Sequence, residues 1–134
     1  MNETILVIDF GAQYSQVIAR KVRECSVYCE VLSWKTSLEI IKQKNPIGII
    51  LSGGPSSVYE ENSPTISKEI FQMGIPVLGI CYGMQLMVKL LGGEVVPAQT
   101  ALAREYGKSL TSFDQKCIIF SDLPKKESVT WMSH

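Results

Sequence analysis

The sequence has no excess of charge of either sign, because its 13 lysine and arginine residues balance 13 aspartate and glutamate residues. It therefore lacks the net field that would attract nucleic acid or an anionic membrane surface, and we expect neither as a partner. The chain also lacks a basic N-terminal region followed by a long apolar stretch, and no apolar run approaches the length of a membrane span. These absences favour a soluble, cytoplasmic protein.

Potential metal ligands are also few. Histidine occurs once, as His134 at the final position, and Cys25 and Cys29 are too few for a metal site, so no metal is expected. Together with Cys81 and Cys117 they could form two disulfides in a secreted protein, but in a cytoplasmic chain free thiols are expected. The sequence contains no low-complexity segment, linker or internal repeat.

The sequence does contain an alternation of apolar runs and amphipathic stretches, within a length of 134 residues and a hydrophobic content of 46% that suit one compact domain. The runs predict strands at 4–9, 27–32, 47–52 and 75–80, and the stretches between and after them predict helices at 15–25, 37–44, 63–74 and 82–93. We expect Val17, Ile18 and Val22 to share one helical face, Ser37 to cap a helix, and Gly92-Gly93 to end one. Strands joined by helices predict an open, mostly parallel α/β sheet with helices on both faces, similar to flavodoxin. The last third suggests shorter strands in "GEVVP", "KSLTSF", "KCIIF" and "SVTWM".

Three segments follow predicted strands at the edge of the sheet where such folds bind ligands. They are "DFGAQYSQ", "SGGPSSVYEENSP" and "CYGMQ". Cys81 opens the third, at a strand-to-helix turn where a sharp elbow needs small neighbours such as Gly79 and Gly83. A thiol at a helix N-terminus is favoured as the thiolate, which is the nucleophilic form. The backbone N–H of Tyr82 and one from the Gly53-Gly54 loop could then form an oxyanion hole for acyl transfer.

Other interpretations of these segments remain open. A lone cysteine in an apolar stretch is more often a small core residue than a nucleophile. The loop "SGGPSS" could bind phosphate through its N–H groups, although it lacks the Gly-Lys-Ser/Thr ending of a Walker motif, and "DFGAQ" lacks the three glycines of a dinucleotide site. Cys117 in "KCIIF" is most simply a strand residue.

Five separated motifs carry a family resemblance that runs from Thr4 to the last residue. "LGICYGMQ" and "ILSGGPSSVYEENSP" resemble class I, triad-type glutamine amidotransferases, and "DFGAQYSQVIARKVRE", "REYGKS" and "VTWMSH" resemble the amidotransferase domains of the GMP synthetase family. The resemblance implies that Cys81 attacks the carboxamide of glutamine and that Gly54 and Tyr82 supply the oxyanion-hole N–H groups. It also implies that glutamine is held by Gln85 and Gly53 and by the segment Arg104, Glu105, Tyr106 and Gly107.

The sequence departs from that family in one respect, because the His-Pro-Glu motif that completes the triad is absent. His134 stands in "WMSH", a different family motif, and is not assigned as the general base. We therefore expect residues 1–134 to be the N-terminal part of an amidotransferase domain in a longer protein, nearly inactive alone. No cofactor is expected in this domain. The resemblance implies a synthetase domain elsewhere that uses ATP and Mg²⁺ to aminate xanthosine monophosphate, in a homodimeric enzyme.

The sequence leaves two other functions open. The chain could be a flavodoxin-like binding or regulatory module in which Cys81 is inert, and the rate of thiol alkylation at Cys81 relative to Cys117 would test this. It could also be an amidotransferase that serves another ammonia acceptor, which the downstream sequence would decide.

Overall fold

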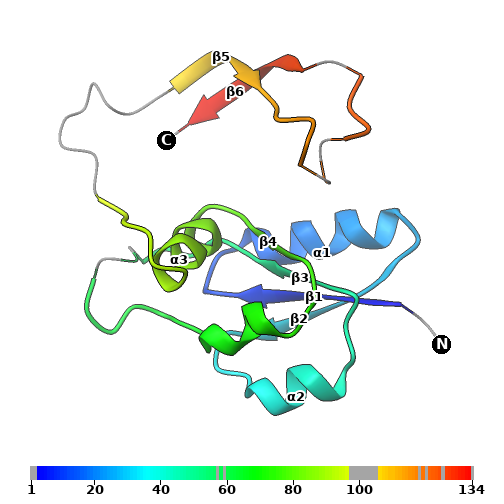
Figure 1. Ribbon diagram of the computed structural model, residues 1–134, viewed down its shortest axis with the longest axis vertical. Coiled ribbons are helices and arrows are strands. Elements are labelled where there is room, and N and C mark those ends of the chain that lie inside the picture. The colour runs from blue at the N-terminus through cyan, green and yellow to red at the C-terminus, as the bar shows by residue number, and fades with distance from the viewer. Residues whose placement is uncertain are drawn as a thin grey trace. The chain divides into compact units, whose positions relative to one another are not determined.

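The computed structural model describes residues 3–56, 58, 60–96, 106–117, 119, 121–124 and 126–133. The chain divides into two compact units, residues 1–96 and residues 97–134. The ribbon of each unit can be followed in Figure 1. The expectation that the whole chain is one part of a single amidotransferase domain stays a prediction.

The first unit is built on a four-stranded sheet whose paired strands are all parallel, in the order β2-β1-β3-β4. Its strands are β1 (Thr4–Asp9), β2 (Tyr28–Ser33), β3 (Gly48–Leu51) and β4 (Val77–Gly79). The connections contain α1 (Tyr14–Glu24), α2 (Leu38–Gln43) and the 3₁₀ helix η1 (Lys68–Gln72), and α3 (Tyr82–Leu90) follows β4. This architecture confirms the predicted open, parallel α/β fold.

Both faces of the sheet are buried, because successive side chains of β1 point to opposite sides. Leu6 and Ile8 lie in one core cluster, which includes Ile41 of α2, Ile70 of η1 and Leu86 of α3. Val7 lies in a second cluster with Ala19 of α1 and Cys29 of β2. Figure 1 shows α1 and α2 on opposite sides of the sheet. Because β1 lies between the two buried clusters, its central residues must be apolar, as they are in the sequence.

The ends of two helices follow the predicted signals. The Ser37 side chain caps α2 by accepting a hydrogen bond from the N–H of Ile40 at 3.4 Å. Gly92 has a φ of +95°, and the N–H groups of Gly92 and Gly93 donate to the carbonyls of Lys89 and Val88. This is the paired C-terminal arrangement that stops a helix at glycine, and it confirms the predicted end of α3.

Two predictions in the first unit are wrong in detail. The helix predicted at 63–74 is reduced to the five residues of η1, and residues 63–67 are irregular. Val17 is exposed, while Ser15 and Ala19 are the buried residues of α1. The small side chains let α1 approach the sheet closely, so Ile18 and Val22 pack beside Ala19 without Val17.

The second unit contains an antiparallel pair, β5 (Tyr106–Ser112) and β6 (Glu127–Ser133), in which Tyr106 lies opposite Ser133 and Ser112 opposite Glu127. These strands include the predicted segments "KSLTSF", up to Ser112, and "SVTWM". The strands predicted in "GEVVP" and "KCIIF" are wrong where the structure describes them, because residues 93–96 are irregular, residues 116 and 117 lie in a turn, and residue 119 has 3₁₀ geometry.

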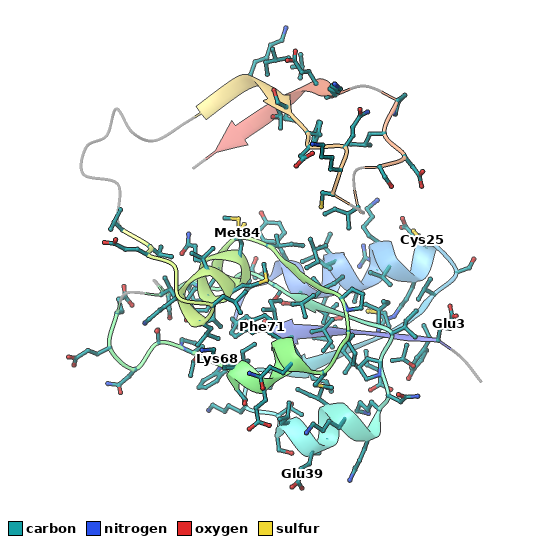
Figure 2. The ribbon with its side chains drawn as sticks, viewed as in Figure 1. Glu3, Cys25, Glu39, Lys68, Phe71 and Met84 are labelled. Atoms are coloured by element: carbon teal, nitrogen blue, oxygen red, sulfur yellow. The ribbon has the colours of Figure 1, made fainter. Side chains whose placement is uncertain are left out.

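The outer surfaces of the helices carry both charged and apolar side chains. Figure 2 shows Glu39 projecting from α2, and Met84 projecting from α3, away from the sheet. Within the part of the chain that the structure describes, no helix is both long enough and apolar enough to cross a bilayer.

Candidate active site

Cys81 occupies a strained turn between β4 and α3. Its φ and ψ are 52° and −117°, a backbone conformation that a residue with a side chain rarely adopts. The turn is held on both sides, because the N–H of Ile80 donates to the carbonyl of Leu51 and the N–H of Gln85 donates to the carbonyl of Cys81. The thiol is exposed. The predicted sharp turn between strand and helix at Cys81 is therefore confirmed.

The two glycines beside Cys81 are required by close backbone packing. A Cβ at Gly83 would lie 2.1 Å from the carbonyl oxygen of Leu51, and a Cβ at Gly79 would lie 2.7 Å from the Cα of Met84. Both distances are far below van der Waals contact, so no other residue fits without moving β3 or α3. The spacing of glycines around the cysteine thus has the steric cause that the sequence suggested.

The Gly53-Gly54 loop lies directly beside the thiol. A Cβ at Gly53 would be 3.5 Å from the Cβ of Cys81, and a Cβ at Gly54 would be 2.6 Å from the carbonyl oxygen of Phe10. The N–H of Gly83 also donates to the carbonyl of Ser52 at 3.0 Å, which fastens the loop to the start of α3. The structure therefore brings together two segments that the sequence placed at one edge of the sheet.

A cavity of about 470 Å³ opens at this point, within the range of small-molecule sites. Its walls come from the loops after β1, β3 and β4: Gly11, Ala12, Gln13, Tyr14, Gly53, Gly54, Pro55 and Cys81. The wall from residues 11–14 belongs to the predicted segment "DFGAQYSQ", although no residue of it was assigned a role from the sequence. Convergence of loops at the carboxyl ends of parallel strands is the signal that indicated it.

Tyr82 contributes to the site through its backbone and to the core through its side chain. The ring is buried against Phe10, with 5.2 Å between ring centroids, and the hydroxyl donates to the carbonyl of Pro64. Tyr82 is the first residue of α3, where N–H groups have no carbonyl partner within the helix. Its N–H, like that of Gly54, is available as an oxyanion-hole donor by position, and both roles stay predictions.

The predicted substrate contacts are only partly described by the structure. Gln85 is half-buried one turn after Cys81 and does not line the cavity. Tyr106 and Gly107 begin β5 in the second unit. Arg104 and Glu105, like His134, lie outside the described residues. The role of each in holding glutamine therefore stays a prediction.

The thiols differ in their surroundings. Burial raises the pKa of the Cys29 thiol, only partly offset by the nearby Arg23 guanidinium, so Cys29 stays protonated and inert. Cys25, Cys81 and Cys117 are exposed, and all four cysteines are free. Cys81 lines the cavity that Gly11, Gly53 and Gly54 also line. No cluster of three or more metal-binding side chains occurs among the described residues.

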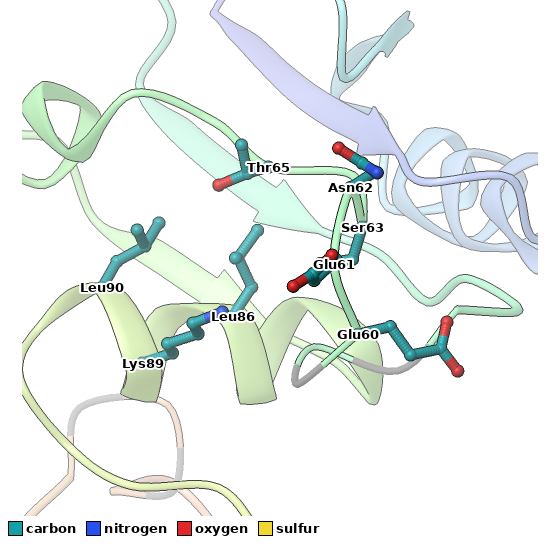
Figure 3. A pocket seen from close by; sticks show the side chains of 8 residues that line it. All are labelled: Glu60, Glu61, Asn62, Ser63, Thr65, Leu86, Lys89 and Leu90. Atoms are coloured by element: carbon teal, nitrogen blue, oxygen red, sulfur yellow. The ribbon is translucent and has the colours of Figure 1, made fainter.

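A second cavity of about 430 Å³ lies between the 60–65 loop and α3, as Figure 3 shows. Glu60, Asn62 and Thr65 are on its loop side, and Leu86 and Lys89 are on its helix side. The Lys89 ammonium donates to the carbonyl of Val58 at 2.8 Å. None of these residues belongs to the predicted site, and Cys81 is not in its walls. The chemistry at Cys81 therefore belongs to the other cavity.

Comparison with known proteins adds three findings. The family model "Glutamine amidotransferase class-I" matches residues 6–134. The chain is 57% identical to a glutamine-hydrolysing GMP synthase of Agathobacter rectalis and 58% identical to one of Clostridium tetani, over 99% of this chain and 25% of each relative. It thus spans about a quarter of the length of the curated relatives that it matches. A crystal structure of a protein from Thermoplasma acidophilum, described as one subunit of a GMP synthase, matches with a TM-score of 0.77 and 29% identity, over 98% of this chain and 64% of that one.

Proposed function

From the membership of this chain in the class-I glutamine amidotransferase family, we propose that it forms the nucleophile-bearing part of a site that hydrolyses glutamine for GMP synthesis. One observation carries the proposal. Cys81 sits at a strained turn at the N-terminus of α3, exposed in a cavity of about 470 Å³ beside Gly53. A nucleophile elbow of this kind is built for acyl transfer.

The chemistry follows from these positions. The Cys81 thiolate attacks the carboxamide carbon of glutamine, and the N–H groups of Gly54 and Tyr82 donate to the oxygen that becomes negatively charged. Collapse of the tetrahedral intermediate breaks the C–N bond, and the departing nitrogen takes a proton and leaves as ammonia. Water then cleaves the thioester, so that glutamine and water yield glutamate and ammonia.

Substrate holding is assigned by the family resemblance. Gln85 and Gly53 would contact glutamine near the nucleophile, and Arg104, Glu105, Tyr106 and Gly107 would close over its α-amino and α-carboxylate groups. Gly53 supports this assignment, because its missing side chain leaves room next to Cys81.

Proton transfer needs groups that residues 1–134 do not supply. A general base must activate the water and protonate the ammonia, and the sequence has no His-Pro-Glu motif. We propose that a histidine and a glutamate from a longer polypeptide complete the triad, consistent with relatives about four times as long. The same polypeptide would contain a synthetase domain that binds ATP and Mg²⁺ and aminates xanthosine monophosphate, and the complete enzyme would be a homodimer.

A reducing compartment suits this chemistry. The nucleophile must be a free thiol, and all four cysteines are free. Free thiols persist in the cytoplasm and are oxidised outside the cell, which supports a cytoplasmic location.

The test uses the full-length protein that contains this chain. Cys81→Ala should abolish GMP formation from glutamine and leave formation from added ammonia unchanged, because ammonia bypasses the thiol. Cys117→Ala, which removes another exposed thiol, should change neither activity. Equal loss of both activities in Cys81→Ala would refute the assignment of Cys81 as the glutaminase nucleophile.

A further inference from the structure

Two serine side chains are fully buried next to the cavity. Ser15 and Ser52 are 1% and 0% exposed, and they are the polar residues in the buried class among the residues that the structure describes. They come from different strand-end segments, 37 positions apart in the sequence. Burial of a hydroxyl is unfavourable unless it is hydrogen-bonded, so the hydrogen-bond partners of Ser15 and Ser52 indicate why these hydroxyls are buried.

The two hydroxyls form a short chain of hydrogen bonds. Ser15 Oγ donates to Asp9 Oδ1 at 2.8 Å, and Ser52 Oγ, which lies 2.9 Å from Ser15 Oγ and 2.8 Å from the carbonyl oxygen of Ile8, can donate its proton to either. Each hydroxyl has one proton, so two protons serve three contacts. Removal of either hydroxyl leaves the other with an acceptor of its own, and no buried donor is stranded.

These hydrogen bonds connect all three segments that surround the Cys81 thiol. Ser52 immediately precedes Gly53, and its carbonyl accepts the N–H of Gly83 in the elbow at 3.0 Å. Ser15 immediately follows the cavity wall formed by residues 11–14. Asp9 Oδ1 also accepts the N–H of Gly11 at 2.8 Å, which fixes the start of that wall.

We propose that Ser15 and Ser52 are positioning residues for glutamine hydrolysis, an inference that rests on the proposed function. Their contact holds the wall of residues 11–14 and the wall of residues 53–55 in register with the elbow at Cys81. Oxyanion-hole donors accelerate a reaction only when they are fixed before the charge develops, and a shift of about 1 Å can lower the rate by about 100-fold. Neither hydroxyl lines the cavity, so their effect on the reaction acts through the loops.

The experiment measures glutamine-dependent and ammonia-dependent GMP formation in the full-length protein carrying Ser15→Ala, Ser52→Ala or both. Each single variant should lower kcat with glutamine by about 10- to 100-fold while KM changes by about twofold or less, since the lost alignment matters in the transition state. Activity with ammonia should stay at the wild-type level. The double variant should lose little more than the worse single variant, because the two hydroxyls act as one unit.

Two controls separate positioning from stability. Ser37→Ala removes the exposed cap of α2 and should lower the melting temperature without changing kcat. Ser15→Thr and Ser15→Val add the same volume, but only threonine keeps the hydroxyl, so threonine should retain several-fold more glutamine-dependent activity than valine.

Specific results would overturn the proposal. These are a wild-type kcat with glutamine in both alanine variants, a parallel loss of glutamine- and ammonia-dependent activity, or equal activities of the threonine and valine variants. Failure of the proposed function is recognised separately, because Cys81→Ala would then keep its glutamine-dependent activity in the same assay, and this result would overturn both proposals.

Discussion

The two units of the chain differ in how they are stabilised. Residues 3–96 contain a parallel sheet with a buried cluster on each face, whereas the described part of residues 106–133 is a two-stranded pair with turns. Leu110, Ile119 and Val129 of the second unit are 65%, 58% and 50% exposed. A two-stranded pair is marginally stable by itself. The turn at Cys81 is therefore supported by the buried clusters of its own unit, whereas the pair that begins at Tyr106 has too little buried apolar surface to be stable by itself.

The largest expected effect concerns the rate of glutamine hydrolysis by residues 1–134, which include both units. Glutamate release from glutamine by residues 1–134 should be at least about 10³-fold slower than by a protein extended through the whole amidotransferase domain, because we propose that the general base lies outside these residues. A coupled glutamate assay on both proteins makes the measurement. Activity of the short chain within a few-fold of the long one, lost in His134→Ala, would identify His134 as the base and refute this account.

The next largest expected effect is the loss of stability caused by a substitution in the turn at Cys81. Gly83→Ala places a Cβ 2.1 Å from the carbonyl oxygen of Leu51 and should destabilise the chain by about 4 kcal/mol, beyond the usual cost of overpacking. Gly74→Ala is the matched control, since Gly74 has a φ of +71° but open space around it, and should cost about 1 kcal/mol. Urea unfolding gives both values. Equal costs would show that the elbow is not tightly packed.

The stability costs of two leucine-to-alanine substitutions, one in each unit, compare how well the two units are packed. Leu6→Ala removes a fully buried side chain of β1 and should cost about 2–5 kcal/mol, whereas Leu110→Ala in β5 should cost no more than about 0.5 kcal/mol. Thermal unfolding of each variant measures the difference. A large effect at Leu110 would mean that the second unit is packed like the first.

The smallest effect concerns a surface ion pair of the first unit. Hydrogen bonds from Lys44 and Tyr28 lower the pKa of the Glu30 carboxyl, whose Oε2 lies 2.7 Å from the Lys44 Nζ. Because the pKa is lower in the folded state, this contribution is present above the ordinary glutamate pKa and is lost as pH falls through the folded value. Glu30→Gln should therefore flatten the acid limb of melting temperature against pH. An unchanged acid limb would show that the pair contributes nothing.

The local sequence predicted the parts of the fold that local patterns control. The apolar run of β1, the Ser37 cap and the Gly92-Gly93 stop depend on neighbouring residues, and each was found. The helix predicted over residues 63–74 was not found over its first residues, where the carbonyl of Pro64 accepts a hydrogen bond from the Tyr82 hydroxyl, a contact distant in sequence that the local pattern does not reveal.

The candidate site was predictable to a similar extent. The glycine spacing around Cys81 indicated the elbow, since the steric demand is local. The Ser15–Ser52 contact was not predicted, because it joins residues 37 positions apart and buries hydroxyls that are usually exposed. Val17 was wrongly predicted to lie on the inward face of α1 for the same reason, because Ser15 and Ala19 face the sheet instead and Val17 is exposed.

The assignment of Cys81 as the nucleophile can be tested by chemical labelling. The full-length protein is treated with a chloroketone analogue of glutamine, and the modified peptide is identified by mass spectrometry. We expect an adduct on Cys81 that glutamine prevents, with Cys25 and Cys117 unmodified although both are also exposed. Modification of Cys25 or Cys117 as fast as Cys81, or labelling of Cys81 that glutamine does not slow, would contradict this assignment.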